Sequence, residues 1–187
     1  NTFYHADTVK KLVCRFHDPS IGAVCGELDL QPTGSVRGEV SYWNYENALK
    51  KLESTFDTTI AATGAVYAIR RNLFVPLPTD KVVMDDFLTA LNVIRNGKKV
   101  KYESAARAYE RSPDSVGGEF RRKSRIGAAK CHGVSEFASL LHPRYGFAAF
   151  ALWSHKIIRW SVPFLLIAMF AANLLLAGTE GAYRWLF

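Results

Sequence analysis

Cysteine is scarce in this chain of 187 residues, and its three copies, Cys14, Cys25 and Cys131, stand far apart. No two of them have the close spacing of a zinc or redox motif, and an odd number does not make a fully paired disulfide framework. We therefore predict reduced thiols of a cytosolic environment that serve as buried packing residues.

The chain also lacks the composition of a disordered protein, because 49% of its residues are hydrophobic and only 22% are charged. We expect no signal peptide at its start. Its first residue is Asn1 rather than methionine, and the first residues have the pattern of the middle of a fold. We therefore expect the sequence to be a fragment of a longer protein.

Positive charge is in excess, with a net charge of +7 and a pI of about 9.4. Such a balance suits nucleic acid, an anionic membrane surface or an anionic substrate. The basic residues are not interleaved with aromatic side chains as in a base-stacking platform, and many lie in one run at residues 121–130. We expect membrane lipid and an anionic substrate as partners and no nucleic acid. Binding of nucleic acid through the basic run is a weaker alternative.

Helical and extended patterns alternate along the first two thirds of the chain, which predicts an α/β layer structure. The predicted strands cover residues 21–30, part of 63–71 and 98–108. Helices are expected at residues 9–16, 42–56 and 87–94.

In the second of these helices the apolar residues Ala48, Leu49, Leu52 and Phe56 share one face, which we expect to be buried. The opposite face is expected to meet water, and its charged members are Lys50, Lys51 and Glu53.

The acidic pair Asp85-Asp86 stands between three apolar residues and an apolar helical pattern. Two interpretations are open. The pair is a helix cap followed by a first-turn carboxylate, which suits the orphan N–H groups and the helix dipole, or it holds a general base at a helix N-terminus. Spacing alone favours the cap. A turn at Gly64 also lies next to a predicted strand, so a cleft shared with the pair is feasible.

Residues 161–178 form an uncharged run of 18 residues. As a helix at ~1.5 Å per residue it is about 27 Å long, close to the ~30 Å hydrocarbon core of a bilayer. Trp160 suits an interfacial anchor, and basic residues precede it. We predict a transmembrane helix over residues 160–178 of a cell inner membrane, with residues 1–159 in the cytoplasm and 179–187 as an extracytoplasmic loop or the start of another span. A buried helix of a soluble protein is the alternative.

Several residue groups together resemble one known family. They are Gly22-Ala23-Val24-Cys25-Gly26, Tyr42-Trp43-x-Tyr45-Glu46, Thr63-Gly64-Ala65-x-Tyr67-Ala68-Ile69-Arg70-Arg71 and Asp85-Asp86-Phe87. Arg122-x-x-Arg125-Ile126 looks like a variant of the family's Gln-x-x-Arg-Trp motif, and residues 154–160 with the apolar run behind them are also similar. The set resembles the bacterial membrane-bound glycosyltransferases of family 2, which are relatives of cellulose and hyaluronan synthases.

The resemblance implies a GT-A fold, a Rossmann-like nucleotide-sugar domain, of which residues 1–118 carry the acceptor-side half. Residues 119–159 are then the basic motif and amphipathic interface helices ahead of the membrane helix. Asn1-Thr2 looks like the tail of the family's Asp-x-Asp-like metal motif. A divalent metal, Mg2+ or Mn2+, is therefore expected to bind just upstream of Asn1 with no ligand in this chain. A fragment without the donor-binding half is expected to be inactive alone.

The resemblance implies an inverting transfer from a nucleotide-diphosphate sugar, expected to be UDP-linked, to a saccharide or lipid-linked acceptor. The family's general base falls on Asp86, with Asp85 second, and the turn Thr63-Gly64-Ala65 lines the acceptor site. Such a base takes the proton of the acceptor hydroxyl as the sugar carbon is attacked. The alternative is a non-catalytic, membrane-anchored interaction module in which the acidic pair is only a helix cap.

Three positions of the basic motif also receive roles. Arg122 and Arg125 are expected to bind the diphosphate, which suits the guanidinium group. Ile126 takes the acceptor-binding position at which relatives have tryptophan, and it has no aromatic face on which a sugar can stack. An enzyme that adds a single sugar is therefore as plausible as a processive synthase.

Overall fold

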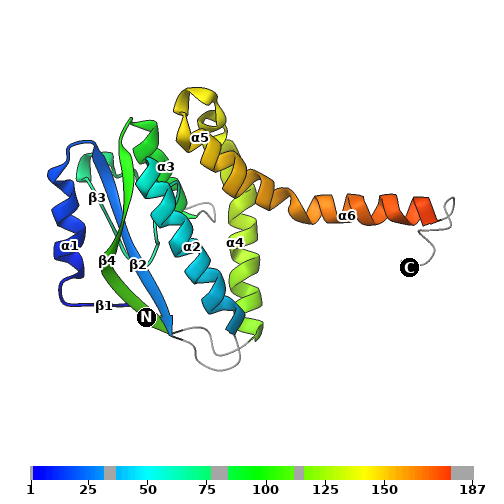
Figure 1. The fold of residues 1–187 in the computed structure, drawn as a ribbon, viewed down its shortest axis with the longest axis horizontal. Coiled ribbons are helices and arrows are strands. Elements are labelled where there is room, and N and C mark those ends of the chain that lie inside the picture. Colours follow the sequence, from blue (N-terminus) through cyan, green and yellow to red (C-terminus); the bar gives the residue numbers. More distant parts are fainter. Residues whose placement is uncertain (1, 32–36, 77–83, 112–115, 178–187) are drawn as a thin grey trace.

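The computed structural model describes residues 2–31, 37–76, 84–111 and 116–177 (Figure 1). Four strands form one sheet in the order β1-β4-β2-β3. The central strands β2 and β4 are parallel, whereas β1 and β3 run antiparallel to their neighbours. The strands are β1 Thr2–Tyr4, β2 Ile21–Gln31, β3 Tyr67–Ile69 and β4 Lys99–Arg111. The helices before the C-terminal segment are α1 Thr8–Cys14, α2 Arg37–Phe56, α3 Asp85–Arg95 and α4 Val116–Phe137. The predicted α/β layer structure is confirmed.

Strand β2 builds the core on both faces of the sheet. Its side chains alternate, because successive residues of a strand point to opposite faces. Val24 and Leu28 pack in one apolar cluster with Leu12 of α1, while Ala23 and Cys25 pack in the cluster that α3 completes. A strand buried on both faces reads as a continuous apolar run, which is why residues 21–30 were predictable.

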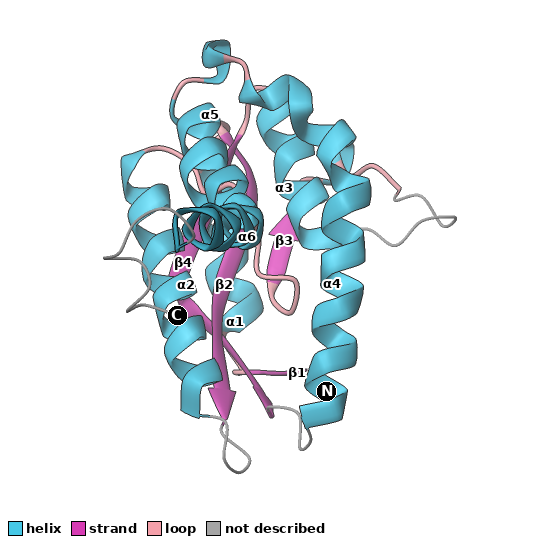
Figure 2. Cartoon of the chain, turned by 90° about the vertical axis from the view of Figure 1, so that its right-hand side faces the viewer, coloured by secondary structure: helices cyan, strands magenta, loops and turns pink. Residues whose placement is uncertain are grey.

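The helices α2 and α3 cover the face of the sheet opposite α1, and α4 lies beside α3 (Figures 1 and 2). Helix α3 packs closely on β2, since a Cβ atom built on Gly22 would come within 2.6 Å of Val93 Cγ1. The α3–α4 contact includes Phe87 and Phe137, whose ring centroids are 5.4 Å apart in an edge-on arrangement. The first turn of α3 is thereby fixed between the sheet and α4.

Helix α2 presents the opposite face to the one predicted. Leu52 and Phe56 are 58% and 77% exposed, whereas Lys50 and Glu53 are only 6% and 3% exposed. Lys51 is exposed, as predicted. The prediction was wrong because it assumed that charged side chains face water. Here the charged face packs beneath the C-terminal helical segment, which carries charges of its own.

That segment is a helix of three parts: α5 Phe147–Ala151, the π-helical turn η5 Leu152–Ile157 and α6 Ile158–Ala177. Helix α6 projects away from the rest of the molecule (Figure 1). The stretch Phe147–Leu176 is long and apolar enough to cross a membrane, and an apolar window of 18 residues within it has a mean hydropathy of 1.7 and no buried residue. The predicted terminal segment, residues 179–187, lies outside the described residues.

Candidate active site

The acidic pair opens helix α3. Met84 is the N-cap residue and its side chain makes no cap hydrogen bond, so Asp85 and Asp86 both lie in the first turn. Neither aspartate is therefore the N-cap residue that the simpler interpretation predicted, although both suit the positive end of the helix dipole. Asp85 is exposed and Asp86 is partly buried. Asp86 Oδ1 accepts a hydrogen bond of 2.7 Å from the backbone N–H of Phe87.

The turn at residues 63–65 lies directly against Asp86. A Cβ atom built on Gly64 would come within 3.2 Å of Asp86 Oδ2 and 3.4 Å of Asp86 Cβ, so this close approach favours glycine. The turn is held from β1, because the Tyr4 hydroxyl donates a hydrogen bond of 2.8 Å to the Ala65 carbonyl oxygen. The structure thus brings the predicted acceptor turn and the predicted base together.

A buried lysine holds the same turn from helix α2. Lys50 Nζ donates a hydrogen bond of 3.0 Å to Thr63 Oγ1 and lies 5.8 Å from the centroid of the Trp43 ring. Burying an ammonium group is costly unless polar or aromatic partners replace water, and these two contacts do so in part. Sequence patterning assigned Lys50 to the solvent and missed this role.

Burial raises the pKa of the Asp86 carboxyl above its ordinary value. The hydrogen bond from Phe87 and the positive charges of Lys50 and Lys156 act against this rise, and the adjacent Asp85 adds to it. A general base works best when its pKa is near the working pH, so a raised carboxylate pKa is a favourable property for that chemistry. Perturbed carboxylates of this kind are candidates for functional sites.

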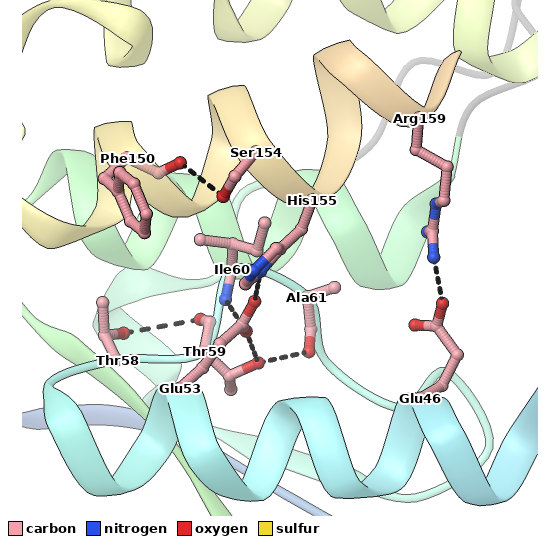
Figure 3. Close-up of polar contacts among 10 residues, drawn as sticks. All are labelled: Glu46, Glu53, Thr58, Thr59, Ile60, Ala61, Phe150, Ser154, His155 and Arg159. Carbon is pink, nitrogen blue, oxygen red and sulfur yellow. Dashed lines mark hydrogen bonds and ion pairs between the residues drawn. The ribbon is translucent and has the colours of Figure 1, made fainter. Parts of the chain in front are cut away.

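Two carboxylates of α2 bind η5 and the first turn of α6 (Figure 3). Glu53 Oε1 lies 2.6 Å from His155 Nδ1, and Glu46 forms an ion pair with Arg159. Burial alone would raise the pKa of Glu46, but the positive charges of Lys156 and Arg159 hold it below its ordinary value. The start of the apolar helix is therefore fastened to the helix that carries Lys50.

Glu53 also fixes the loop that follows α2. Its Oε2 accepts hydrogen bonds of 2.9 Å from Thr59 Oγ1 and 3.2 Å from the backbone N–H of Ile60 (Figure 3). This loop continues into the turn beside Asp86. One buried carboxylate thus connects α2, the 57–62 loop and His155.

The basic motif lies on α4, and the contacts of the described residues do not join it to Asp86. Arg125 is exposed and Ile126 is partly buried. Arg122 lies on the same helix, with its side chain outside what the structure describes. Among the described side chains, Lys50 and Lys156 are the positive charges with the largest effect on Asp86. The expectation that Arg125 converges on the acidic pair is therefore a prediction that the structure leaves open.

No group of three histidine, cysteine, aspartate or glutamate side chains suited to a metal ion occurs in the parts of the chain that the structure describes.

The residues that sequence reasoning missed did carry a signal. Glu46, Lys50 and Glu53 are spaced four and three residues apart, which puts them on one stripe of a helix. The same spacing relates His155 and Arg159. Two charged stripes of opposite net sign predict a helix–helix contact, but a single stripe cannot be told from a solvated face.

No protein-family model matches the sequence, and no curated protein matches it. Among solved structures, the chain is similar to a mannosyltransferase from Pyrobaculum calidifontis in complex with GDP-Man and Mn2+, with 21% sequence identity and a TM-score of 0.54. The match covers 97% of this chain and 54% of the mannosyltransferase, so the chain spans about half the length of that protein. A likeness at this identity concerns the fold. The fold of this chain is therefore similar to that of part of this mannosyltransferase.

Proposed function

We propose that this chain is part of a membrane-bound, inverting glycosyltransferase in which Asp86 is the general base. The observation that carries the proposal is the Asp86 carboxylate itself. It is partly buried, its pKa is raised, and it rests on the Gly64 turn within a glycosyltransferase fold. The adjacent Asp85 is exposed, and it is the second candidate for the base.

In the proposed step the oxygen of an acceptor hydroxyl forms a bond to the anomeric carbon of the donor sugar, on the face opposite the diphosphate. The bond from that carbon to the diphosphate oxygen breaks, and the nucleoside diphosphate leaves with the electron pair. The hydroxyl proton passes to Asp86. The turn at residues 63–65 lines the acceptor, and Arg122 and Arg125 stabilise the charge of the leaving diphosphate.

The fold and the resemblance in the sequence support the proposed donor class. The similar mannosyltransferase was solved with GDP-Man, which supports a nucleotide sugar as substrate here, and the family-2 resemblance favours a UDP-linked one. That structure also contains Mn2+, which supports the use of a divalent metal to neutralise the diphosphate. The described residues offer no ligand set for such an ion, so none of these residues is given a role in metal binding.

We place the reaction at the cytoplasmic face of a membrane. The exposed apolar surface of α6 and the length of Phe147–Leu176 support a membrane-spanning segment. The ion pairs of Glu46 and Glu53 with this helix would hold the catalytic domain against the membrane surface. The proposed acceptor, a saccharide or a lipid-linked group, is used at that membrane face.

The deciding experiment compares Asp86→Asn with Asp85→Asn in membranes that contain the full-length protein. GDP-Man, UDP-glucose and UDP-N-acetylglucosamine are offered in turn with Mn2+ or Mg2+, and the release of nucleoside diphosphate is measured. We expect Asp86→Asn to lower turnover by about 10²–10⁴-fold while donor binding survives, because only the proton acceptor is lost. Near-normal turnover in that variant rejects the base assignment. No nucleotide binding by the unaltered protein favours a non-catalytic membrane module.

A further inference from the structure

Lys50 is a buried charge without a carboxylate at ion-pair distance among the described residues. It is 6% exposed, and it contacts the Thr63 hydroxyl and the Trp43 ring. An apolar side chain of similar length could fill this place without the desolvation cost of an ammonium group. The desolvation cost of the Lys50 ammonium group therefore suggests a role that requires its charge or its hydrogen bond.

The contacts lead from Lys50 to the proposed base in two steps. Lys50 Nζ is 3.0 Å from Thr63 Oγ1, and the next residue, Gly64, is the one whose Cβ would come within 3.2 Å of Asp86 Oδ2. The lysine therefore fixes the surface on which the carboxylate rests. Its positive charge also acts on Asp86 electrostatically.

We propose that Lys50 is a positioning residue for the proposed general base: through Thr63 it holds the Gly64 turn against Asp86, and its charge favours the ionised carboxylate that can accept a proton. This inference rests on the proposed function. Lys50 exchanges no proton with the substrate in this scheme. The proton moves from the acceptor hydroxyl to Asp86.

Two other charged residues also act on the Asp86 carboxylate, and they must be separated from the effect of Lys50. Lys156 of η5 contributes a second positive charge, and its Nζ lies 5.6 Å from the centroid of the Phe87 ring. Asp85 on the same helix opposes both lysines. Of the two cations, Lys50 is the one that also contacts the turn, so its removal should change both the geometry and the ionisation of Asp86.

The kinetic test compares Lys50→Met with Lys51→Met, the exposed neighbour on the same helix. Turnover of GDP-Man and of UDP-glucose is followed as nucleoside diphosphate release across roughly pH 5 to pH 9. For Lys50→Met we expect a fall in kcat of about tenfold or more and an acidic limb displaced to higher pH, with donor KM unchanged. Lys51→Met should match the unaltered protein. Lys50→Arg, which keeps the charge, should keep the acidic limb in place even if kcat falls.

A stability cycle tests the same inference without turnover. Thermal midpoints near neutral pH are measured for Asp86→Asn in the unaltered protein and in the Lys50→Met background. Because Lys50 compensates the buried carboxylate, Asp86→Asn should raise the midpoint more when Lys50 is absent. Equal changes in the two backgrounds overturn the electrostatic role of Lys50. If Lys50→Met does not fold, Thr63→Val with wild-type kcat overturns the positioning role.

The base role of Asp86 and the positioning role of Lys50 are tested by separate outcomes. Loss of turnover in Asp86→Asn together with an unshifted pH profile in Lys50→Met retains the base and removes the role of Lys50. Full turnover in Asp86→Asn removes the base, and the stability cycle then still reports whether Lys50 and Asp86 are coupled.

Discussion

Gly64 and Asp86 lie in direct contact, so close that a Cβ atom on Gly64 would meet Asp86 Oδ2 at 3.2 Å and Asp86 Cβ at 3.4 Å. Gly64→Ala should therefore displace the carboxylate by a few tenths of an ångström. We expect kcat to fall by about tenfold and the free energy of unfolding to fall by about 1–3 kcal/mol. Turnover and thermal unfolding of the purified variant measure both changes.

Gly117→Ala is the matched control for that substitution, because a Cβ atom there has no neighbour within 4 Å and the residue lies in helix α4. Alanine is the better helix former, by up to about 1 kcal/mol. The control should keep wild-type kcat and be at least as stable. A Gly64→Ala variant with equally unchanged kcat would show that the Gly64 contact does not position Asp86.

Asp86→Asn should cost no stability at neutral pH. The pKa of Asp86 is raised in the folded state, so folding favours its neutral form, and the stability that this carboxyl contributes is lost as the pH rises through its folded-state pKa. Asparagine stays neutral, and it can still accept the Phe87 N–H bond. The advantage of the variant in thermal midpoint should therefore grow from acidic to neutral pH. A constant penalty at every pH contradicts the burial argument.

The Glu53–His155 contact should stabilise the junction between α2 and the helix that leads into α6. Glu53 is 3% exposed and its Oε1 lies 2.6 Å from His155 Nδ1. We expect Glu53→Gln to lower the free energy of unfolding by about 1–3 kcal/mol. A double-mutant cycle with His155→Gln should give a coupling of roughly 0.5–3 kcal/mol.

The exposed pair Lys11–Asp7 provides the comparison for that cycle. Its Nζ–Oδ2 distance is also 2.6 Å, but the two side chains are 38% and 54% exposed. Water screens such an exposed pair, so its coupling should be much smaller than that of the buried pair. If both cycles give the same small coupling, the buried pair does not hold the junction.

Elements whose pattern follows from their own burial could be predicted from the sequence. Strand β2 alternates Ala23 and Cys25 with Val24 and Leu28 into two cores, and the run of apolar residues was sufficient to find it. Helix α3 begins at Asp85, the first residue of the acidic pair, and its buried apolar face was likewise visible in the sequence. In each case the environment of a residue depends on one face of a sheet or helix that the local period defines.

The environment of α2 could not be predicted in this way. Lys50 and Glu53 are buried because Thr63 and His155, distant in sequence, supply their partners. Patterning treats charge as a sign of solvent, and a buried charge whose partner comes from another element violates that rule. The same limit applies to the candidate site: the acidic pair and the Gly64 turn stood out as motifs, whereas the lysine behind them did not.

The apolar helix α6 should span a membrane. Leu166 and Ile167 are 54% and 67% exposed on α6, as side chains that meet lipid would be. Each lysine near the centre of a spanning helix adds about 2.5–3.5 kcal/mol to the free energy of insertion. We therefore expect the segment of residues 147–177, placed in a host protein with glycosylation sites on both sides, to span the membrane. The Leu166→Lys/Ile167→Lys variant should span it much less often, and Leu166→Val/Ile167→Val should behave like the unaltered segment. If the unaltered segment fails to span, the exposed face of α6 must be covered by protein rather than lipid, and the proposed membrane location falls with it.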